Sequence, residues 1–132
     1  MMDDSKQIIL ALGTNSEQEL NMEKAREMLV ALLGTLRFSI NIWTHPIDIV
    51  SDDFLNCMVI GQTSMSLSAL NAALKKIERS CGDTSYKRRK NVVKMDIDIL
   101  KYDTTIMHEK DWKRPYILQL LDEMKIEHKN EI

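Results

Sequence analysis

Apolar residues recur along the chain with the two-residue period of a strand in some segments and with the 3.6-residue period of a helix in others. Residues 7–12 form a short apolar run that ends at Gly-Thr-Asn (13–15), which predicts a strand followed by a turn. Ser16 and Glu19 match a capping box, so we expect a helix to follow and to end at Gly34. Its apolar face would consist of Met22, Ala25, Leu29, Leu32 and Leu33.

The middle of the chain predicts two strands separated by a loop. Apolar and polar residues alternate over residues 38–42, which indicates a strand with one apolar face that ends at Trp43. That face would consist of Phe38, Ile40 and Ile42. Residues 44–53 break the pattern and are expected to be a loop, and residues 54–63 predict a third strand.

The second half of the chain predicts a helix, a basic loop, a last strand and a short final helix. The helix begins near Ser66 and ends at Gly82. Its apolar face would consist of Leu70, Ala73, Leu74, Ile77 and Cys81. A mobile loop then leads into a fourth strand over residues 92–102. Proline opens a short helix over residues 115–124, and residues 125–132 form a polar, frayed tail.

The predicted order of elements, β-α-β-β-α-β, is the split βαβ arrangement of ferredoxin-like folds. We therefore expect an α+β protein with an antiparallel sheet, both helices on one face of the sheet, and a short C-terminal helix. With 132 residues, the chain forms a single domain over residues 1–132, whose core covers about residues 7–124.

Composition narrows the class of function. The net charge of −2 and the 29% of charged residues argue against a dedicated nucleic-acid binder. No apolar run is long enough to cross a bilayer and the amino terminus does not resemble a signal peptide, so we expect no membrane association and a cytoplasmic protein. Cys57 and Cys81 lack metal-binding spacing and are expected to be reduced core thiols.

Two aspartates, Asp96 and Asp98, lie one residue apart in the apolar segment of the last predicted strand. Strand alternation sends both carboxylates to the same face, about 6.6 Å apart, where they repel by about 2 to 3 kcal/mol at an effective dielectric of about 20. A divalent cation removes this repulsion, and Mg²⁺ usually takes one or two carboxylates together with substrate phosphates. The alternative interpretation of the pair is an exposed strand face that happens to carry two acids.

A local excess of positive charge precedes this strand. Residues 83–94 carry five basic side chains and one acid. The basic residues are Lys87, Arg88, Arg89, Lys90 and Lys94. Cations on a flexible loop beside a carboxylate pair suit a polyphosphate, with a metal at one end and basic groups around the rest. A solvated loop is the alternative.

Four short segments stand in an order that invites comparison with known enzymes. They are Ala-Leu-Gly-Thr-Asn (11–15), Asp-Phe-Leu-Asn (53–56), Ile-Glu (77–78) and Met-Asp-Ile-Asp-Ile (95–99). On the matching frame of strands and helices, over about residues 7–124, they resemble the 6-hydroxymethyl-7,8-dihydropterin pyrophosphokinase family of folate biosynthesis. The resemblance implies a Mg²⁺-dependent transfer of the terminal pyrophosphoryl group of ATP to the hydroxymethyl group of the pterin, with release of AMP. It also implies small-molecule partners only and a monomer.

The resemblance assigns roles residue by residue. Asp96 and Asp98 would hold two Mg²⁺ ions, and His108 and Arg114 would act beside the phosphates. Glu78, His108 and Arg114 would bind ATP by matching the family's positions. The basic loop residues Lys87, Arg88, Arg89 and Lys90 would bind ATP from positions shifted relative to the family's arginines. The residues that would bind the pterin are Thr44, Pro46, Phe54, Asn56 and Tyr116, with Phe54 and Tyr116 on either side of the ring and Asn56 at its polar edge. Residues 13–15 would border the pterin pocket as a structural part, and His45 and His128 are assigned no role.

The sequence also departs from the family pattern. Where the family usually carries two loop arginines, a tryptophan and a third arginine, this chain has Asp83, Ser85, Lys90 and Val93. A second interpretation is therefore a relative that binds pterin or nucleotide without transferring the pyrophosphoryl group. A third is an RNA-binding module on the same frame, which is disfavoured because residues 54–63 lack the basic and aromatic side chains that stack bases.

Overall fold

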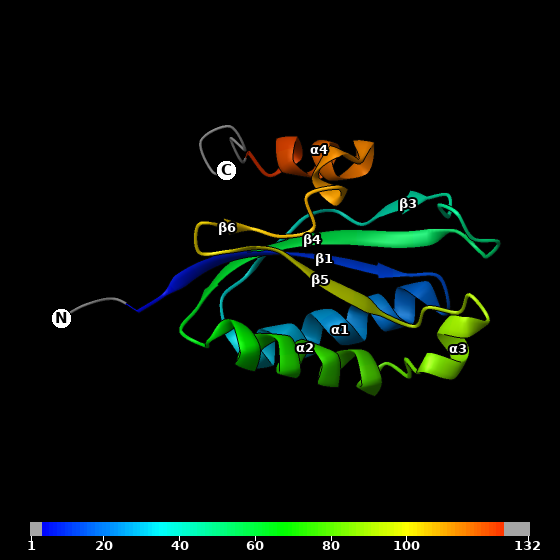
Figure 1. The fold of residues 1–132 in the computed structure, drawn as a ribbon, viewed down its shortest axis with the longest axis horizontal. Coiled ribbons are helices and arrows are strands. Elements are labelled where there is room, and N and C mark those ends of the chain that lie inside the picture. The colour runs from blue at the N-terminus through cyan, green and yellow to red at the C-terminus, as the bar shows by residue number, and fades with distance from the viewer. Residues whose placement is uncertain (1–3, 126–132) are drawn as a thin grey trace.

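The computed structural model describes residues 4–125 as an antiparallel sheet with helices on both of its faces (Figure 1). The central strand is β1 (Lys6–Thr14), which pairs with β4 (Phe54–Thr63) on one side and with β5 (Asp96–Tyr102) on the other. The strand order is β2-β4-β1-β5-β6, and β3 also pairs with β4. This confirms the predicted ferredoxin-like α+β class, because β1 and the strand after the first helix are separated by β4.

Helices α1 (Gln18–Leu33) and α2 (Leu67–Ser80) cover one face of the sheet, as predicted (Figure 1). The N-cap of α2 is Ser66, whose Oγ accepts a hydrogen bond from the Ala69 N–H at 3.1 Å. Helix α1 ends at Gly34, whose φ of +83° suits glycine. The predicted capping box at its start is wrong, because the N-cap is Glu17 and its side chain makes no capping bond.

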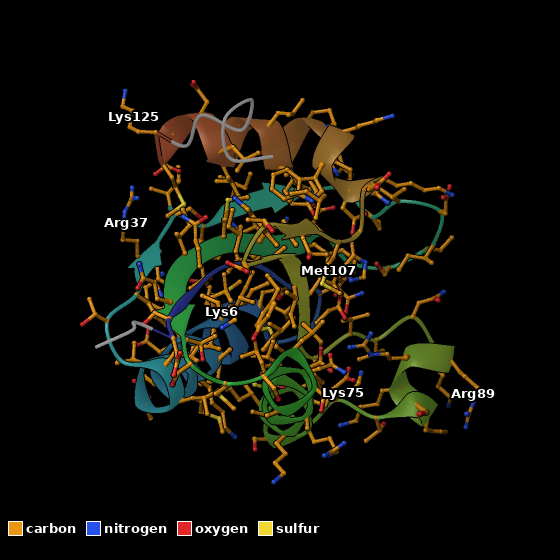
Figure 2. All side chains as sticks on the ribbon, turned by 60° about the vertical axis from the view of Figure 1, so that its left-hand side comes forward. Lys6, Arg37, Lys75, Arg89, Met107 and Lys125 are labelled. Carbon is orange, nitrogen blue, oxygen red and sulfur yellow. The ribbon has the colours of Figure 1, made fainter. Side chains whose placement is uncertain are left out.

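The opposite face of the sheet is covered by the 3₁₀ turn η1 (Asp111–Lys113) and by α4 (Pro115–Glu123), which confirms the predicted C-terminal helix (Figure 1). One apolar cluster lies between the sheet and the pair α1 and α2, and a second lies between the sheet and α4. Side chains fill both of these layers (Figure 2). The buried members of the second cluster are Ile9, Met58, Ile60, Leu100, Trp112, Ile117, Leu120, Leu121 and Met124. Burial on both faces explains why the central strands are nearly continuous apolar runs.

The strand predicted over residues 38–42 is instead two short strands, β2 (Arg37–Phe38) and β3 (Ile42–Thr44). Ser39 lies between them, buried, and its Oγ accepts a hydrogen bond from the Met58 N–H at 2.8 Å. A side chain thus takes over a bond that a strand backbone would make, and Ile40, predicted to face the core, is 58% exposed.

The basic segment also differs from its prediction. It contains a short helix, α3 (Ser85–Arg89), whose N-cap Thr84 accepts a hydrogen bond from the Lys87 N–H at 3.1 Å. The last long strand begins at Asp96 rather than at residue 92, and it continues into a hairpin with β6 (Thr105–Ile106), which the sequence pattern did not predict.

Both cysteines are buried and free, as expected. Within residues 4–125 none of the helices combines the length and the apolar character that a membrane crossing requires. The predicted frayed tail and His128 lie outside the described residues, apart from Lys125.

Candidate functional site

Asp96 and Asp98 lie on β5 near the end of β1, on the sheet face that α4 covers. Ile97 and Ile99 alternate with them and belong to the core under α1 and α2, so the two carboxylates point to the other face. In the register of the sheet Asp96 lies beside Gly13 of β1. A neighbour without a side chain leaves space at this point for a ligand.

The negative charges of the two aspartates repel each other. Burial, followed by the charge of Asp96, raises the pKa of Asp98 to about 8. At neutral pH the pair therefore favours holding a proton or a cation. This donor set fits Mg²⁺, which prefers carboxylate oxygens and keeps water and phosphate oxygens as its remaining ligands. Within residues 4–125 no group of three or more His, Cys, Asp or Glu side chains could hold a metal ion by itself, so those other ligands would be required.

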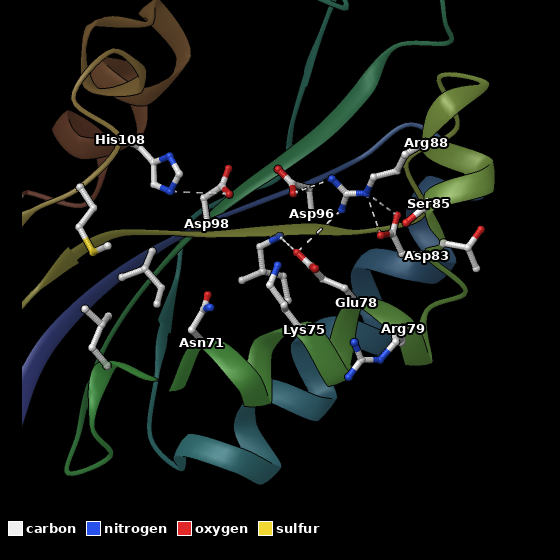
Figure 3. A pocket seen from close by; sticks show the side chains of 15 residues that line it. Asn71, Lys75, Glu78, Arg79, Asp83, Ser85, Arg88, Asp96, Asp98 and His108 are labelled. Atoms are coloured by element: carbon white, nitrogen blue, oxygen red, sulfur yellow. Dashed lines mark hydrogen bonds and ion pairs between the residues drawn. The ribbon is translucent and has the colours of Figure 1, made fainter. Parts of the chain in front are cut away.

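A cavity of about 650 Å³ lies along the edge of β5 that β6 does not cover, and it extends from α2 to Asp96 and Asp98 (Figure 3). The wall formed by α2 carries Asn71, Lys75 and Arg79, which recur every four residues and so share one side of the helix. The sequence analysis did not single out these residues. Their spacing, opposite the apolar face of the same helix, is the signal that could have identified them.

Glu78, predicted to bind ATP, lines this cavity but already has a structural partner. It is 8% exposed, and its Oε2 accepts a hydrogen bond from the Ile97 N–H at 2.7 Å. Burial raises the pKa of this carboxyl, and the bond to Ile97 opposes that effect. Glu78 therefore attaches α2 to the strand that carries the aspartates.

The predicted basic residues around α3 have different surroundings. Arg88 lines the larger cavity, whereas Lys87, Arg89 and Lys90 are absent from the walls of both cavities at the aspartates. The Lys87 Nζ donates to the Gly82 carbonyl at 2.9 Å, and the Lys90 Nζ lies 4.6 Å from the centre of the Tyr86 ring. Arg89 is exposed on α3 (Figure 2). Among these four residues, Arg88 is the one placed to meet a ligand in the cavity.

The Arg88 guanidinium connects α3 to the aspartates (Figure 3). Its Nε donates to both carboxylate oxygens of Asp83, at 3.0 and 2.8 Å. Its two terminal nitrogens donate to Asp96 Oδ1 at 3.1 Å and to the Met95 carbonyl at 3.0 Å. Burial alone would lower the pKa of Arg88, but the bonds to Asp83 and Asp96 outweigh it and raise that pKa. Asp83 therefore holds Arg88 in place.

A second cavity, of about 290 Å³, lies on the sheet face near the start of α4. The structure brings four of the five predicted pterin-binding residues to its wall: Thr44, Phe54, Asn56 and Tyr116. The Asn56 Nδ2 donates to Thr44 Oγ1 at 2.8 Å, so this amide is held in a fixed orientation. Burial is the main cause that raises the pKa of Tyr116 to about 12, so its hydroxyl stays protonated.

The loop beside this cavity differs from its assignment in two residues. Pro46 is absent from the wall, whereas His45, which was assigned no role, contributes to it together with Ile47. The His45 Nδ1 lies 3.0 Å from Asp53 Oδ1, and the His45 side chain is 93% exposed.

His108 and Arg114, predicted to act together beside the phosphates, line different cavities. His108 lines the larger one, with its Nε2 4.0 Å from Asp98 Oδ1, and Arg114 lines the smaller one. The Arg114 Nε donates to Asp111 Oδ1 at 2.9 Å. Asp111, which the sequence analysis missed, is also 4.0 Å from His108 Nδ1 and so lies between the two.

Residues 13–15 support the site, with Gly13 on the wall of the smaller cavity. Asn15 is buried and exchanges side-chain bonds with the segment before β5: its Nδ2 donates to the Asn91 carbonyl at 2.8 Å, and its Oδ1 accepts from the Val93 N–H at 2.7 Å. These bonds fix the approach of the chain to Asp96.

The two cavities share Asp96 and Asp98. Groups held in the two cavities would therefore meet at the carboxylates. The arrangement suits a transfer between two bound molecules, one of them anionic and neutralised by cations.

Comparison with known proteins agrees with the family that the sequence resembles. Residues 9–126 match the family model of 7,8-dihydro-6-hydroxymethylpterin-pyrophosphokinase. The chain is 30% identical over 124 residues to the folate synthesis bifunctional protein of Arabidopsis thaliana, a match covering 86% of this chain and 26% of that protein. It is also 30% identical over 124 residues to the mitochondrial folate synthesis bifunctional protein of Pisum sativum, covering 86% of this chain and 24% of that protein. The chain thus spans about a quarter of the length of these relatives.

Proposed function

The chain belongs to the 7,8-dihydro-6-hydroxymethylpterin-pyrophosphokinase family, and on this premise we propose that it transfers the terminal pyrophosphoryl group of ATP to 6-hydroxymethyl-7,8-dihydropterin in folate biosynthesis. In this reaction the pterin hydroxyl oxygen forms a bond to the β-phosphorus of ATP. The bond from that phosphorus to the α-phosphate oxygen breaks, the hydroxyl proton is released, and AMP leaves.

The smaller cavity would take the pterin. Phe54 and Tyr116 contribute aromatic side chains that suit a flat ring, and the Asn56 amide supplies a polar group at one edge. Because the Asn56 Nδ2 donates to Thr44, its Oδ1 is the atom left to accept from an N–H of the pterin. The volume of about 290 Å³ suits a small bicyclic ligand.

The larger cavity would take ATP. Lys75, Arg79 and Arg88 supply positive charge on its walls, and its volume of about 650 Å³ leaves room for a nucleotide. The phosphates would extend toward Asp96 and Asp98, where the pterin hydroxyl enters from the other side. Phosphoryl transfer asks the protein mainly for alignment and charge neutralisation, which this arrangement provides.

Asp96 and Asp98 would hold two Mg²⁺ ions together with phosphate oxygens and water. Magnesium bound there would neutralise phosphate charge and lower the pKa of the attacking hydroxyl. The carboxylates supply the negative charge that keeps the cations at the junction of the two cavities, so losing either carboxylate should reduce the rate more than it affects folding.

The observation that carries this proposal is that Asp96 and Asp98 belong to the walls of both cavities. Cation-binding carboxylates at that junction serve a reaction between two ligands better than the binding of either ligand alone. The test incubates the purified chain with the hydroxymethyl dihydropterin, ATP and Mg²⁺. We expect AMP and the pterin diphosphate in equal amounts.

Asp96→Asn tests the assignment of the carboxylates and should abolish AMP formation while the chain stays folded. Asp103→Asn is the matched control, because Asp103 is exposed in the turn after the same strand and its φ of +58° is one that asparagine tolerates. Unchanged activity of Asp96→Asn would contradict the assignment.

The pairing of Arg88 with Asp96 favours one alternative, a relative that binds its ligands without transfer. An arginine that stayed on this carboxylate would compete with magnesium. Release of ADP, or binding of both ligands without AMP, would establish this alternative.

A further inference from the structure

Arg88 occupies one of the two carboxylate oxygens with which Asp96 could bind a cation. Its terminal nitrogen is 3.1 Å from Asp96 Oδ1, and both side chains are 36% exposed, so the pair is accessible from the larger cavity (Figure 3). Asp98 has no such partner among the described ion pairs, where it is matched only with the His108 ring, whose Nε2 lies 4.0 Å away. The two carboxylates therefore differ: Asp96 is paired with an arginine and Asp98 is not.

Arg88 is also held from behind. Asp83 accepts two hydrogen bonds from the Arg88 Nε, and the Met95 carbonyl accepts a third bond from a terminal nitrogen. Asp83 is 11% exposed at its side chain, so this anchor is well shielded from water. A bare divalent ion at Asp96 would break the bond to Arg88 and leave the guanidinium beside a second cation, with no anion added.

A polyphosphate changes this balance, because its oxygens can accept the guanidinium that Asp96 gives up. Arg88 lies on the wall of the cavity that carries Lys75 and Arg79, so phosphates drawn there by these cations would come within its reach.

We propose that Arg88 determines the form in which a divalent cation reaches Asp96: it excludes the bare ion and yields to an ion that arrives with a polyphosphate. The Asp83 carboxylate keeps the guanidinium at the cavity during the exchange. The identity of the polyphosphate as ATP rests on the proposed function, whereas the exclusion of the bare ion depends on Arg88 and on the carboxylates around it, which are Asp83, Glu78, Asp96 and Asp98.

The first measurement is the affinity of the chain for Mn²⁺ alone, without nucleotide, from the electron paramagnetic resonance signal of the free ion. We expect Arg88→Gln to bind Mn²⁺ about tenfold more tightly than the wild type, because a competing ion pair is removed. The matched control is Arg89→Gln, which loses the same charge from the next residue. It should stay within about twofold of the wild type, because Arg89 is absent from the cavity wall.

The second measurement is the affinity for α,β-methylene ATP in the presence of Mn²⁺. Here Arg88→Gln should bind about tenfold more weakly than the wild type, because the phosphates lose a guanidinium. Arg88→Gln should therefore bind the bare ion more tightly and the nucleotide more weakly. General damage to the site would not produce these two opposite changes in affinity.

Bare Mn²⁺ affinity of Arg88→Gln equal to that of Arg89→Gln, including no measurable binding by either, would overturn the proposal. If circular dichroism shows that Arg88→Gln is unfolded, Arg88→Lys takes its place. A single ammonium cannot reach Asp83 and Asp96 together as the guanidinium does, so Mn²⁺ should bind about threefold more tightly than in the wild type, and an unchanged affinity would again refute the idea. Failure of the proposed function is distinguishable, since it shows as missing AMP while the effect on bare Mn²⁺ persists.

Discussion

Replacing Asp98 by asparagine should stabilise the metal-free chain, and the gain should grow with pH. The pKa of Asp98 is raised to about 8, first by burial and then by the charge of Asp96. In the unfolded chain the same group titrates near pH 4. Between these two values the unfolded state has released the proton that the folded state keeps, so the wild type loses stability as pH rises.

The size of the effect follows from the shift. From pH 5 to pH 8 a fully shielded group would lose about 4 kcal/mol, at 1.36 kcal/mol for each pH unit. The Asp98 side chain is 32% exposed, so solvent screening reduces this value. We expect about 2 kcal/mol, which is comparable with the repulsion of about 2 to 3 kcal/mol between two carboxylates at same-face strand positions.

The assay is urea unfolding of both proteins at pH 5 and pH 8, with a chelator present. The stability of Asp98→Asn relative to the wild type should rise by about 2 kcal/mol between the two pH values, and taking this difference cancels the groups that both proteins share. The control is Asp103→Asn, which removes an exposed carboxylate from the turn after the same strand and so should show no such gain. A pH-independent difference for Asp98→Asn would refute the reasoning.

Two further predictions concern residues that support the site and the sheet. Asp111→Ala removes the acceptor of the Arg114 Nε and should weaken binding of a pterin analogue about fivefold in a fluorescence titration. Asp111→Asn keeps an acceptor and should restore part of the lost affinity. Equal affinities of the wild type and Asp111→Ala would contradict this role. Ser39→Ala leaves the buried Met58 N–H unpaired and should cost about 1 to 3 kcal/mol in urea unfolding, with AMP formation retained; an unchanged unfolding midpoint would show that the N–H finds another partner.

The elements that could be predicted from the sequence are those whose local signals agree. Strand β4 has the predicted bounds of residues 54–63, and α2 begins beside Ser66, where the helix was predicted to start. The prediction of one strand over residues 38–42 was wrong because the hydrogen bond that interrupts this strand joins Ser39 to Met58, 19 residues away. The alternation of apolar residues carries no information about that bond. Helix α3 was not predicted for a different reason, since five residues are too few to show a helical period.

The site divides in the same way. The shared face of Asp96 and Asp98 is a local property of a strand, so the sequence predicted it. That the pair lies between two cavities depends on the register of β5 against β1 and on the return of the chain over the sheet at α4, which no local pattern contains. Asp111 owes its position to contacts with His108 and Arg114, so it could be recognised only in the folded chain. Arg88 was predicted to bind ATP together with three other basic residues, and its contacts with Asp83 and Asp96 are what distinguish it from them.

The unequal surroundings of the two aspartates explain how a stable domain can keep an unfavourable pair of charges. Arg88 pairs with Asp96 and so weakens the repulsion between the two carboxylates, while it shares its charge with Asp83. The raised pKa of Asp98 means that its charged form is unfavourable in the folded chain. A cation that entered the site would remove this unfavourable electrostatic energy. If both carboxylates were paired with arginines, our proposal predicts weaker binding of a metal. If neither were paired, it predicts that bare ions would bind at the junction without any phosphate. One paired and one unpaired carboxylate therefore favour the joint arrival of metal and polyphosphate, since together they satisfy both Asp98 and Arg88.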